Sequence, residues 1–233
     1  RPRLYQSICA IQALRAIPVP CYQDSVAEEM AYILEHAEVK VAIVENQEQV
    51  DKILEVFKKI PSLEYIIYDD PRGLRDYQEE FIYSMDKLAS EKGYEEFDFI
   101  SYARAGSSSD VAIILYTSGT TGKPKGVLLS YNNIISVAKK AAQIENLTKN
   151  DNVIAYLPMA WVGDNVFSYA QSYITGFCVN CPESTETTGQ DMKEIGPTYY
   201  FGPPRIFENM LTSVHIRMED AHAIKRYLFK YYM

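Results

Sequence analysis

Cysteine, histidine and tryptophan are scarce in this sequence, which holds four, three and one of them among 233 residues. Four cysteines are too few to suggest a disulfide framework in a chain of this length. Cys178 and Cys181 have the spacing of half a zinc site or of a redox pair, but no second C-x-x-C exists and the histidines show no ligand pattern. We therefore expect reduced cysteines at a strand end rather than a metal or redox site.

An excess of basic residues and long apolar runs are also missing. The net charge is −8 and the pI is near 5.0, which argues against general nucleic-acid binding because such binding needs a basic surface. The sequence has no signal peptide and no apolar run long enough to span a bilayer. These absences predict a cytoplasmic protein, with loose attachment to a membrane surface left open. A polyanionic substrate would have to be held by local donors.

Apolar residues make up 47% of the chain, enough for a substantial core. They alternate between short continuous runs and helical stripes, and Ser25 with Glu28 predicts a capping box, while Ser130 predicts an N-cap. The strand candidates are residues 39–45, 64–68, 110–116, 152–157, 177–181 and 198–201, and the last helical stripes are residues 206–218 and 221–231. This alternation predicts an α/β fold with mostly parallel sheets flanked by helices, whose apolar stripes form the core.

Residues 69–109 break the alternation. They are charged, and their only helical signal is a short stretch around residues 84–92. Forty residues with so little periodicity predict a surface excursion.

The most distinctive stretch, Tyr116-Thr-Ser-Gly-Thr-Thr-Gly-Lys-Pro-Lys-Gly-Val127, directly follows a strand candidate. Its glycines allow unusual backbone conformations, and its N–H and hydroxyl groups can converge on an anion. Gly119 and Gly122 are too close for a Walker A loop, and Pro124 stands where that motif needs Ser or Thr. The dinucleotide pattern G-x-G-x-x-G is also absent. The stretch therefore predicts a phosphate-binding loop of another design, at the carboxyl end of a parallel strand.

This stretch resembles the signature of the adenylate-forming (AMP-binding) enzymes, which include acyl-CoA synthetases, luciferases and the adenylation domains of peptide synthetases. Residues 15–22, 27–34, 157–161 and 196–208 are similar to segments of the long-chain fatty acyl-CoA synthetase branch. The resemblance covers nearly all of the chain. It implies that residues 1–233 are a partial N-terminal AMP-binding domain, with the C-terminal domain absent.

The resemblance also implies a reaction and its ligands. A fatty acid carboxylate attacks the α-phosphorus of ATP to give an acyl-adenylate and pyrophosphate, and the CoA thiol then displaces AMP. Mg²⁺ is the implied cofactor, with the Thr117 hydroxyl as a candidate ligand, and Lys123 is expected to be a solvated charge. The residues implied to hold the ATP phosphates are Thr117, Ser118, Gly119, Thr120, Thr121, Gly122 and Lys125.

Three further residues are candidates for the acyl-substrate pocket: Trp161, Tyr200 and Gly202. In the resembled family, an aromatic residue or His lies beside the pocket at the position of Trp161, and a strand-to-helix turn like that of Tyr200 and Gly202 lines it. Core packing is an equal alternative for Trp161 and a serious one for the other two. Arg205 is compatible with an anion contact or a solvated helix start. Asp164 is expected at the surface or in local capping.

Later motifs of the resembled family are missing from this chain. No Tyr-Gly-x-Thr-Glu segment, whose Glu holds magnesium in the family, is present. We therefore expect an incomplete and inactive part of a long-chain fatty acid:CoA ligase. Other acyl- or aryl-CoA ligases, an acyl-AMP ligase, a peptide-synthetase adenylation domain and a non-catalytic nucleotide-binding module stay open as alternatives, as does homo-oligomerisation.

Overall fold

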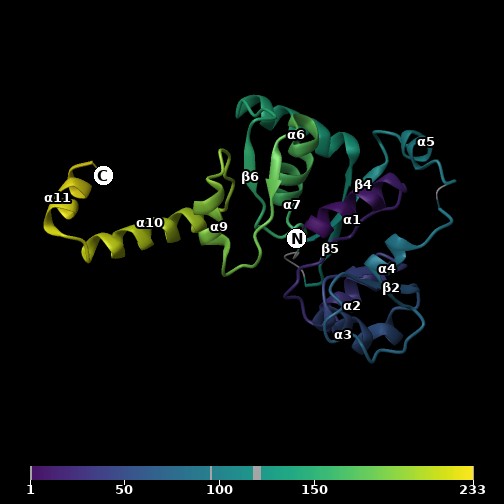
Figure 1. Ribbon diagram of the computed structural model, residues 1–233. Coiled ribbons are helices and arrows are strands. Elements are labelled where there is room, and N and C mark those ends of the chain that lie inside the picture. Colours follow the sequence, from purple (N-terminus) through teal and green to yellow (C-terminus); the bar gives the residue numbers. More distant parts are fainter. Residues whose placement is uncertain (1, 95, 118–121, 233) are drawn as a thin grey trace.

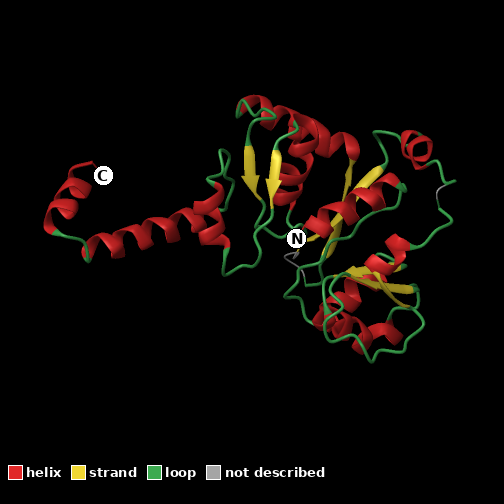
Figure 2. Ribbon diagram, viewed as in Figure 1, coloured by secondary structure: helices red, strands yellow, loops and turns green. Residues whose placement is uncertain are grey.

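The structure, a computed structural model, describes residues 2–94, 96–117 and 122–232. The chain forms two lobes and a projecting helical arm (Figure 1). Figure 2 shows the strands in three groups, which are a three-stranded sheet, an antiparallel pair and a two-stranded sheet. Within the described residues, every strand pairing except that of the antiparallel pair is parallel. The predicted α/β class with mostly parallel sheets is confirmed.

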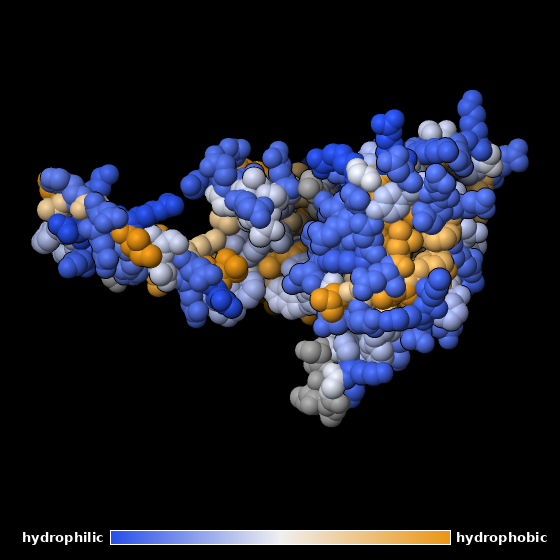
Figure 3. Space-filling view, turned by 90° about the horizontal axis from the view of Figure 1, so that it is seen from below, coloured by the Kyte–Doolittle hydropathy of each residue, from blue (hydrophilic) through white to orange (hydrophobic). Residues whose placement is uncertain are grey.

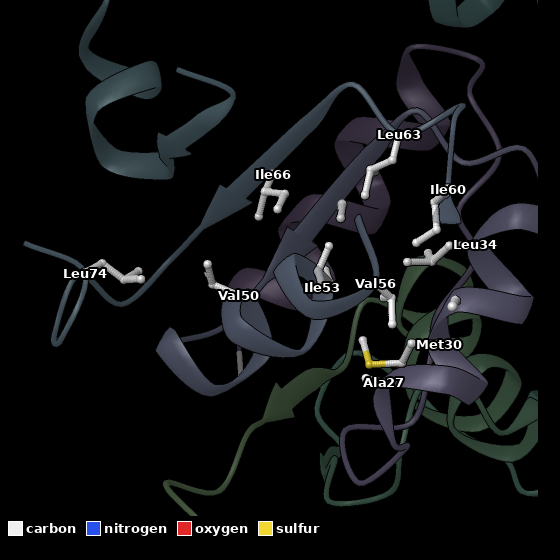
Figure 4. Packing of buried hydrophobic residues seen from close by; sticks show 12 residues of the cluster. Ala27, Met30, Leu34, Val50, Ile53, Val56, Ile60, Leu63, Ile66 and Leu74 are labelled. Atoms are coloured by element: carbon white, nitrogen blue, oxygen red, sulfur yellow. The ribbon is translucent and has the colours of Figure 1, made fainter. Parts of the chain in front are cut away.

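The first lobe is a parallel sheet packed against two helices. Strands β1 (Val41–Val44), β2 (Tyr65–Tyr68) and β3 (Ile82–Ser84) lie in that order. Helices α2 (Ala27–His36) and α3 (Gln47–Val56), the latter followed by a 3₁₀ turn η1 (Phe57–Lys59), bury their apolar stripes against it. Figure 4 shows Val50, Ile53 and Ile66 converging, and each is at most 1% exposed. Met30 and Leu34 of α2 belong to the same apolar core, which packs this helix against the sheet.

Helix α2 begins differently from the sequence prediction. Its N-cap is Val26 and no side chain caps it, so the predicted capping box of Ser25 and Glu28 is wrong. Ser25 is buried, and Glu28 forms an ion pair with Lys59 instead. The capping box does not form because Ser25 is buried and Glu28 is paired with Lys59, so neither side chain bonds the start of α2.

The segment from residue 69 to 109 contributes to the first lobe. Leu74 is 5% exposed and belongs to the buried core, and β3 adds a strand that the apolar periodicity does not predict. Helix α4 (Met85–Ser90) is the short helix predicted here, and the Ser84 hydroxyl caps it. Helix α5 (Phe99–Arg104) follows, capped by Asp98.

The second lobe is built on β4 (Val111–Thr117), β5 (Lys125–Ser130) and helix α6 (Tyr131–Ile144). Ser130 and Asn133 form a capping box at the start of α6, which confirms the predicted N-cap. Ile134 and Ala138 on α6 are buried against Ile113 of β4. Strands β6 (Asn152–Ile154) and β7 (Cys178–Asn180) pair in parallel beside this hairpin. The strand predicted at residues 198–201 is a single bridge between Val153 and Tyr199.

A continuous helical segment connects β6 to β7. It consists of α7 (Val162–Asp164), a π-helical stretch η2 (Asn165–Ala170) and α8 (Gln171–Thr175). Gly176 ends it with φ +78°, a left-handed conformation that favours glycine. Cys178 and Cys181 follow as free thiols.

Helix α1 (Pro2–Ala13), which the sequence patterns do not predict, lies across the second lobe. The Gln12 side-chain amide donates to the Ala112 carbonyl at 2.9 Å, and its oxygen accepts from the Tyr169 hydroxyl at 2.8 Å. Ile8 is buried with Met159 and Tyr169. Polar and apolar contacts together therefore join α1 to β4 and to the π-helical stretch.

The arm contains α9 (Thr188–Ile195), α10 (Pro204–Glu219) and α11 (Ala223–Tyr232). The apolar stripe of α10 is predicted to be core, but Phe207, Leu211 and Val214 are 44–47% exposed. That prediction is wrong for this chain, because α10 and α11 project away from both lobes (Figure 1). Figure 3 shows apolar side chains scattered along the arm. Within the described ranges, no helix combines the length and the apolar character needed to cross a membrane.

Candidate functional site

The predicted phosphate loop connects β4 to β5. Thr117, the last residue of β4, lies opposite Lys125, the first residue of β5. The prediction that the loop follows a parallel strand is wrong, because β4 pairs with β5 in the antiparallel direction. The sequence pattern is misleading here because the glycine-rich stretch runs directly into residues 127–129, an apolar run that completes a second strand. The loop is therefore a hairpin connection.

Among the described residues between the two strands, Gly122 and Lys123 are exposed and Pro124 is half-buried. Thr117 and Lys125 present their side chains to solvent at the end of the hairpin. Gly122 has φ +116° and open space where a Cβ would stand, which is a backbone conformation that other residues resist. Ser118, Gly119, Thr120 and Thr121 lie outside the described residues. The structure thus brings Thr117, Gly122 and Lys125 to one end of β4 and β5.

A second lysine, Lys123, belongs to the connection between β4 and β5. The Nζ atom of Lys123 is 5.0 Å from the ring centroid of Tyr32 on α2, within the range of a cation–π contact. Its side chain is otherwise exposed, as expected for a solvated charge. Lys123 and Lys125 give this end of the hairpin local positive charge in a chain whose net charge is −8.

Helix α2 of the first lobe also contacts the hairpin at both sides of the loop, on β4 and just before β5. The His36 Nδ1 atom lies 2.6 Å from the Tyr116 hydroxyl, and the Tyr32 hydroxyl donates to the Pro124 carbonyl at 3.1 Å. His36 and Tyr116 also line a shallow hollow of about 250 Å³ beside the hairpin. Sequence reasoning missed Tyr32 and His36, because 92 and 80 residues separate them from these partners and no local motif links them.

The three candidates for the acyl pocket belong to one aromatic group. Trp161 stacks on Phe201 with ring centroids 5.7 Å apart, and Tyr200 stacks on Tyr156 at 5.5 Å. Gly202 closes this group, since a Cβ there would stand 2.5 Å from the Tyr156 hydroxyl oxygen. All three candidates are half-buried. The group is a largely apolar surface with one polar edge, the kind of lining that suits an apolar ligand.

Asp164, expected at the surface or in local capping, is 1% exposed and makes no side-chain cap bond, so both expectations are wrong. The Tyr5 hydroxyl of α1 donates to its Oδ2 atom at 2.7 Å, while its Oδ1 atom has no partner among the described residues. Burial raises the pKa of this carboxyl above its ordinary value. The tertiary cause is α1, which covers the start of α7, and no signal near residue 164 predicts that cover.

The sequence is similar to a known enzyme family over almost its whole length. The family model described as AMP-binding enzyme matches residues 1–229. Among curated relatives, the long-chain-fatty-acid–CoA ligase ACSBG1 of Rattus norvegicus is 27% identical over 216 residues, covering 88% of this chain and 29% of the relative. Long chain acyl-CoA synthetase 3 of Arabidopsis thaliana is 31% identical over 230 residues, covering 91% and 33%. The chain thus spans about a third of these relatives' length.

A solved structure has the same fold. The chain is similar to the crystal structure of a putative long-chain-fatty-acid CoA ligase from Rhodopseudomonas palustris, with a TM-score of 0.71 and 18% sequence identity. The match covers 90% of this chain and 49% of the solved one. At this identity the likeness shows the fold alone.

Proposed function

The chain belongs to the family of AMP-binding enzymes, and from this premise we propose that it is part of an ATP-dependent long-chain fatty acid:CoA ligase. The observation that carries the proposal is the family-like stretch at residues 116–127, with Thr117 and Lys125 opposite each other and exposed at the end of β4 and β5. The long-chain substrate is proposed because the curated relatives are named as long-chain ligases.

In the proposed reaction, the carboxylate oxygen of the acid attacks the α-phosphorus of ATP. Pyrophosphate leaves, and the CoA thiol then attacks the acyl carbon and displaces AMP. Nucleotidyl transfer depends on positioning and on neutralising phosphate charge, with little covalent chemistry from the protein. The hairpin end suits this task because Lys125 supplies a compact cation and Gly122 lets the backbone adopt a left-handed conformation beside the ligand.

Mg²⁺ is the cofactor implied by the family, and Thr117 is the residue we propose to contact it. Its hydroxyl is exposed beside the proposed phosphate site, and Mg²⁺ prefers oxygen ligands. One hydroxyl fits as a single member of such a ligand set, with phosphate oxygens and water as the usual others. When bound, the metal would neutralise charge on the phosphates.

The aromatic group of Trp161, Tyr200 and Gly202 is proposed to line the acyl site. Its half-buried ring faces would exclude water from an apolar chain, while the Gly202 backbone leaves room next to Tyr156. The cytoplasmic location, peripheral membrane contact and homo-oligomerisation expected from the sequence stay predictions.

The phosphate loop is tested by Lys125→Ala and Thr117→Ala in the full-length protein. We expect kcat/KM for ATP to fall roughly 5- to 150-fold, the equivalent of about 1–3 kcal/mol for a charge-assisted contact, with KM for CoA unchanged. Lys139→Ala is the matched control, since Lys139 is an exposed lysine of α6 far from the loop in sequence. Unchanged kinetics with ATP in both loop variants would contradict the assignment.

The reaction itself is tested with the unmodified full-length protein, ATP, CoA and acids of graded length. Formation of AMP, pyrophosphate and a long-chain thioester is the expected result. Pyrophosphate release without a thioester would indicate an acyl-AMP ligase, and a preference for aryl or short acids would indicate another ligase of this fold. ATP binding with no turnover would indicate a nucleotide-binding module.

A further inference from the structure

Helix α2 contacts the hairpin at two points, one on β4 at Tyr116 and one at Pro124, the residue just before β5. Tyr116, which His36 contacts at 2.6 Å, directly precedes Thr117. Pro124, whose carbonyl accepts from the Tyr32 hydroxyl at 3.1 Å, directly precedes Lys125. Each contact is therefore one residue away from a proposed phosphate ligand.

The two contacts come from one face of α2. Tyr32 and His36 are four residues apart, a spacing that places side chains above each other on a helix. The ring centroids of Tyr32 and His36 are 5.5 Å apart. The His36 ring meets the Tyr116 ring edge-on, with 5.7 Å between the ring centroids. The Lys123 Nζ atom lies over the Tyr32 ring. The result is a row of side chains, Lys123, Tyr32, His36 and Tyr116, that joins the end of the loop to β4.

Packing holds helix α2, which carries the middle of this row, and Tyr116 at its end on β4. Met30, Ala31 and Leu34 of α2 are buried in the first lobe, so the helix that carries Tyr32 and His36 is rigidly based. Tyr116 is 8% exposed, and Gly126 on β5 leaves the space its ring needs, since a Cβ there would be 3.2 Å from the Tyr116 Cζ atom. Because helix α2 and Tyr116 are both firmly packed, the contacts between them can hold the nearby backbone in a fixed position.

We propose that Tyr32 and His36 are positioning residues for ATP, holding the backbone on each side of the phosphate loop in its binding orientation. The proposal rests on the function proposed above, and neither residue is assigned a contact with substrate. The first lobe thereby has a role in the reaction: it braces a loop that the second lobe carries.

The two polar contacts lie outside the apolar core of the first lobe. His36 is the last residue of α2 and is exposed, and the Tyr32 hydroxyl lies at the lobe surface while the apolar face of α2 makes the core. Removing either polar group therefore leaves the buried face of α2 intact. Loss of position at the loop, without loss of the folded state, is the expected consequence.

The test uses Tyr32→Phe, His36→Ala and His36→Asn in the full-length protein, with steady-state kinetics for each substrate and thermal unfolding. For Tyr32→Phe and His36→Ala, we expect KM for ATP to rise about 3- to 10-fold, the range for a lost hydrogen bond. KM for the acid and the unfolding midpoint should stay at the values of the unmodified protein. His36→Asn keeps a polar atom near the place of Nδ1, so it should recover most of the ATP affinity.

Tyr65→Phe is the matched control, because Tyr65 is an exposed tyrosine of β2 and the same hydroxyl is removed away from the hairpin. Lys125→Ala, assayed in parallel, separates the two proposals. If Lys125→Ala weakens ATP use while Tyr32→Phe and His36→Ala do not, the positioning role is wrong and the loop assignment stands. If Lys125→Ala has no effect, the phosphate-loop assignment is wrong, and the positioning role that rests on it is wrong as well. Equal rises in every KM, together with a lowered unfolding midpoint, would show a purely structural role and overturn the inference.

Discussion

At the scale of single residues, Asp164 is an acidic side chain held almost entirely out of water. Its side chain is 1% exposed, one oxygen accepts from the Tyr5 hydroxyl at 2.7 Å, and the other oxygen lacks a partner within the described part of the chain. Burial is the main cause of its raised pKa, and the bond from Tyr5 opposes it. A buried carboxylate with half its hydrogen bonds costs stability whenever it is ionised.

This environment predicts a pH dependence of stability. Below about pH 3.8, the ordinary carboxyl value, Asp164 is protonated in the folded and unfolded states alike, and its contribution to the free energy of unfolding is fully present. That contribution is lost as the pH rises through the raised pKa of the folded state. In Asp164→Asn, residue 164 does not titrate. The free energy of unfolding of this variant should therefore rise relative to that of the unmodified protein as the pH increases.

The measurement is denaturant unfolding of both proteins from about pH 4 to pH 8. Asp76→Asn is the control, since Asp76 is exposed and the same charge is removed there. A stability difference between Asp164→Asn and the unmodified protein that is constant over the whole range would contradict the buried, raised-pKa carboxyl.

At the scale of elements, the two serine-led helix starts have different outcomes. The Ser130 hydroxyl accepts from the Asn133 backbone N–H at 3.2 Å, and the Asn133 side chain accepts from the Ser130 N–H at 2.9 Å. Helix α2 begins at Ala27 without a side-chain cap, although Ser25 and Glu28 match the same motif. A cap motif is decided by backbone geometry at the helix start, and tertiary packing sets that geometry for α2.

Replacing each serine tests this difference. Ser130→Ala removes a cap and should lower the free energy of unfolding by about 0.5–2 kcal/mol. Ser25→Ala removes no cap bond, so its effect should be smaller, although the side chain is buried. Denaturant unfolding of the two variants provides the comparison. An effect of Ser25→Ala equal to or larger than that of Ser130→Ala would show that α2 is capped after all.

At the scale of the whole molecule, helices α10 and α11 of the arm have apolar side chains that the other described residues leave exposed. Leu211 and Leu228 are 46% and 48% exposed, and Tyr227 and Tyr231 are more than 70% exposed. The amphipathic spacing of these helices is typical of surfaces that bury one face. Exposed apolar side chains on one helix face favour association.

For residues 1–233 by themselves, we expect concentration-dependent association above the monomer mass of 26.6 kDa. Combining Leu211→Lys with Leu228→Lys should shift the equilibrium toward the monomer, because a charge would then have to be desolvated in the contact. Ser213→Lys adds one such charge to α10 without removing an apolar side chain, and it is the control for Leu211→Lys alone. Sedimentation equilibrium measures all three, and a monomer at every concentration would contradict the expectation.

The sequence by itself determined what depends on neighbouring residues. Apolar periodicity predicts strands at residues 39–45, 64–68 and 110–116 and a helix after Ser130, and the structure has strands at residues 41–44, 65–68 and 111–117 and helix α6 after Ser130. The phosphate-binding role of the stretch from Tyr116 to Val127 stays a prediction. These features are local because the backbone conformation, the cap and the loop composition are set within a few residues.

Only the tertiary structure decided which distant residues meet. The contacts of Tyr5 with Asp164, Tyr32 with Pro124 and His36 with Tyr116 span 159, 92 and 80 residues. The same holds for the antiparallel direction of β5 and for the exposure of the α10 stripe, which looks like core in the sequence. Such outcomes depend on how whole faces pack against each other, and a hydrophobic pattern states that a face is apolar without stating what covers it.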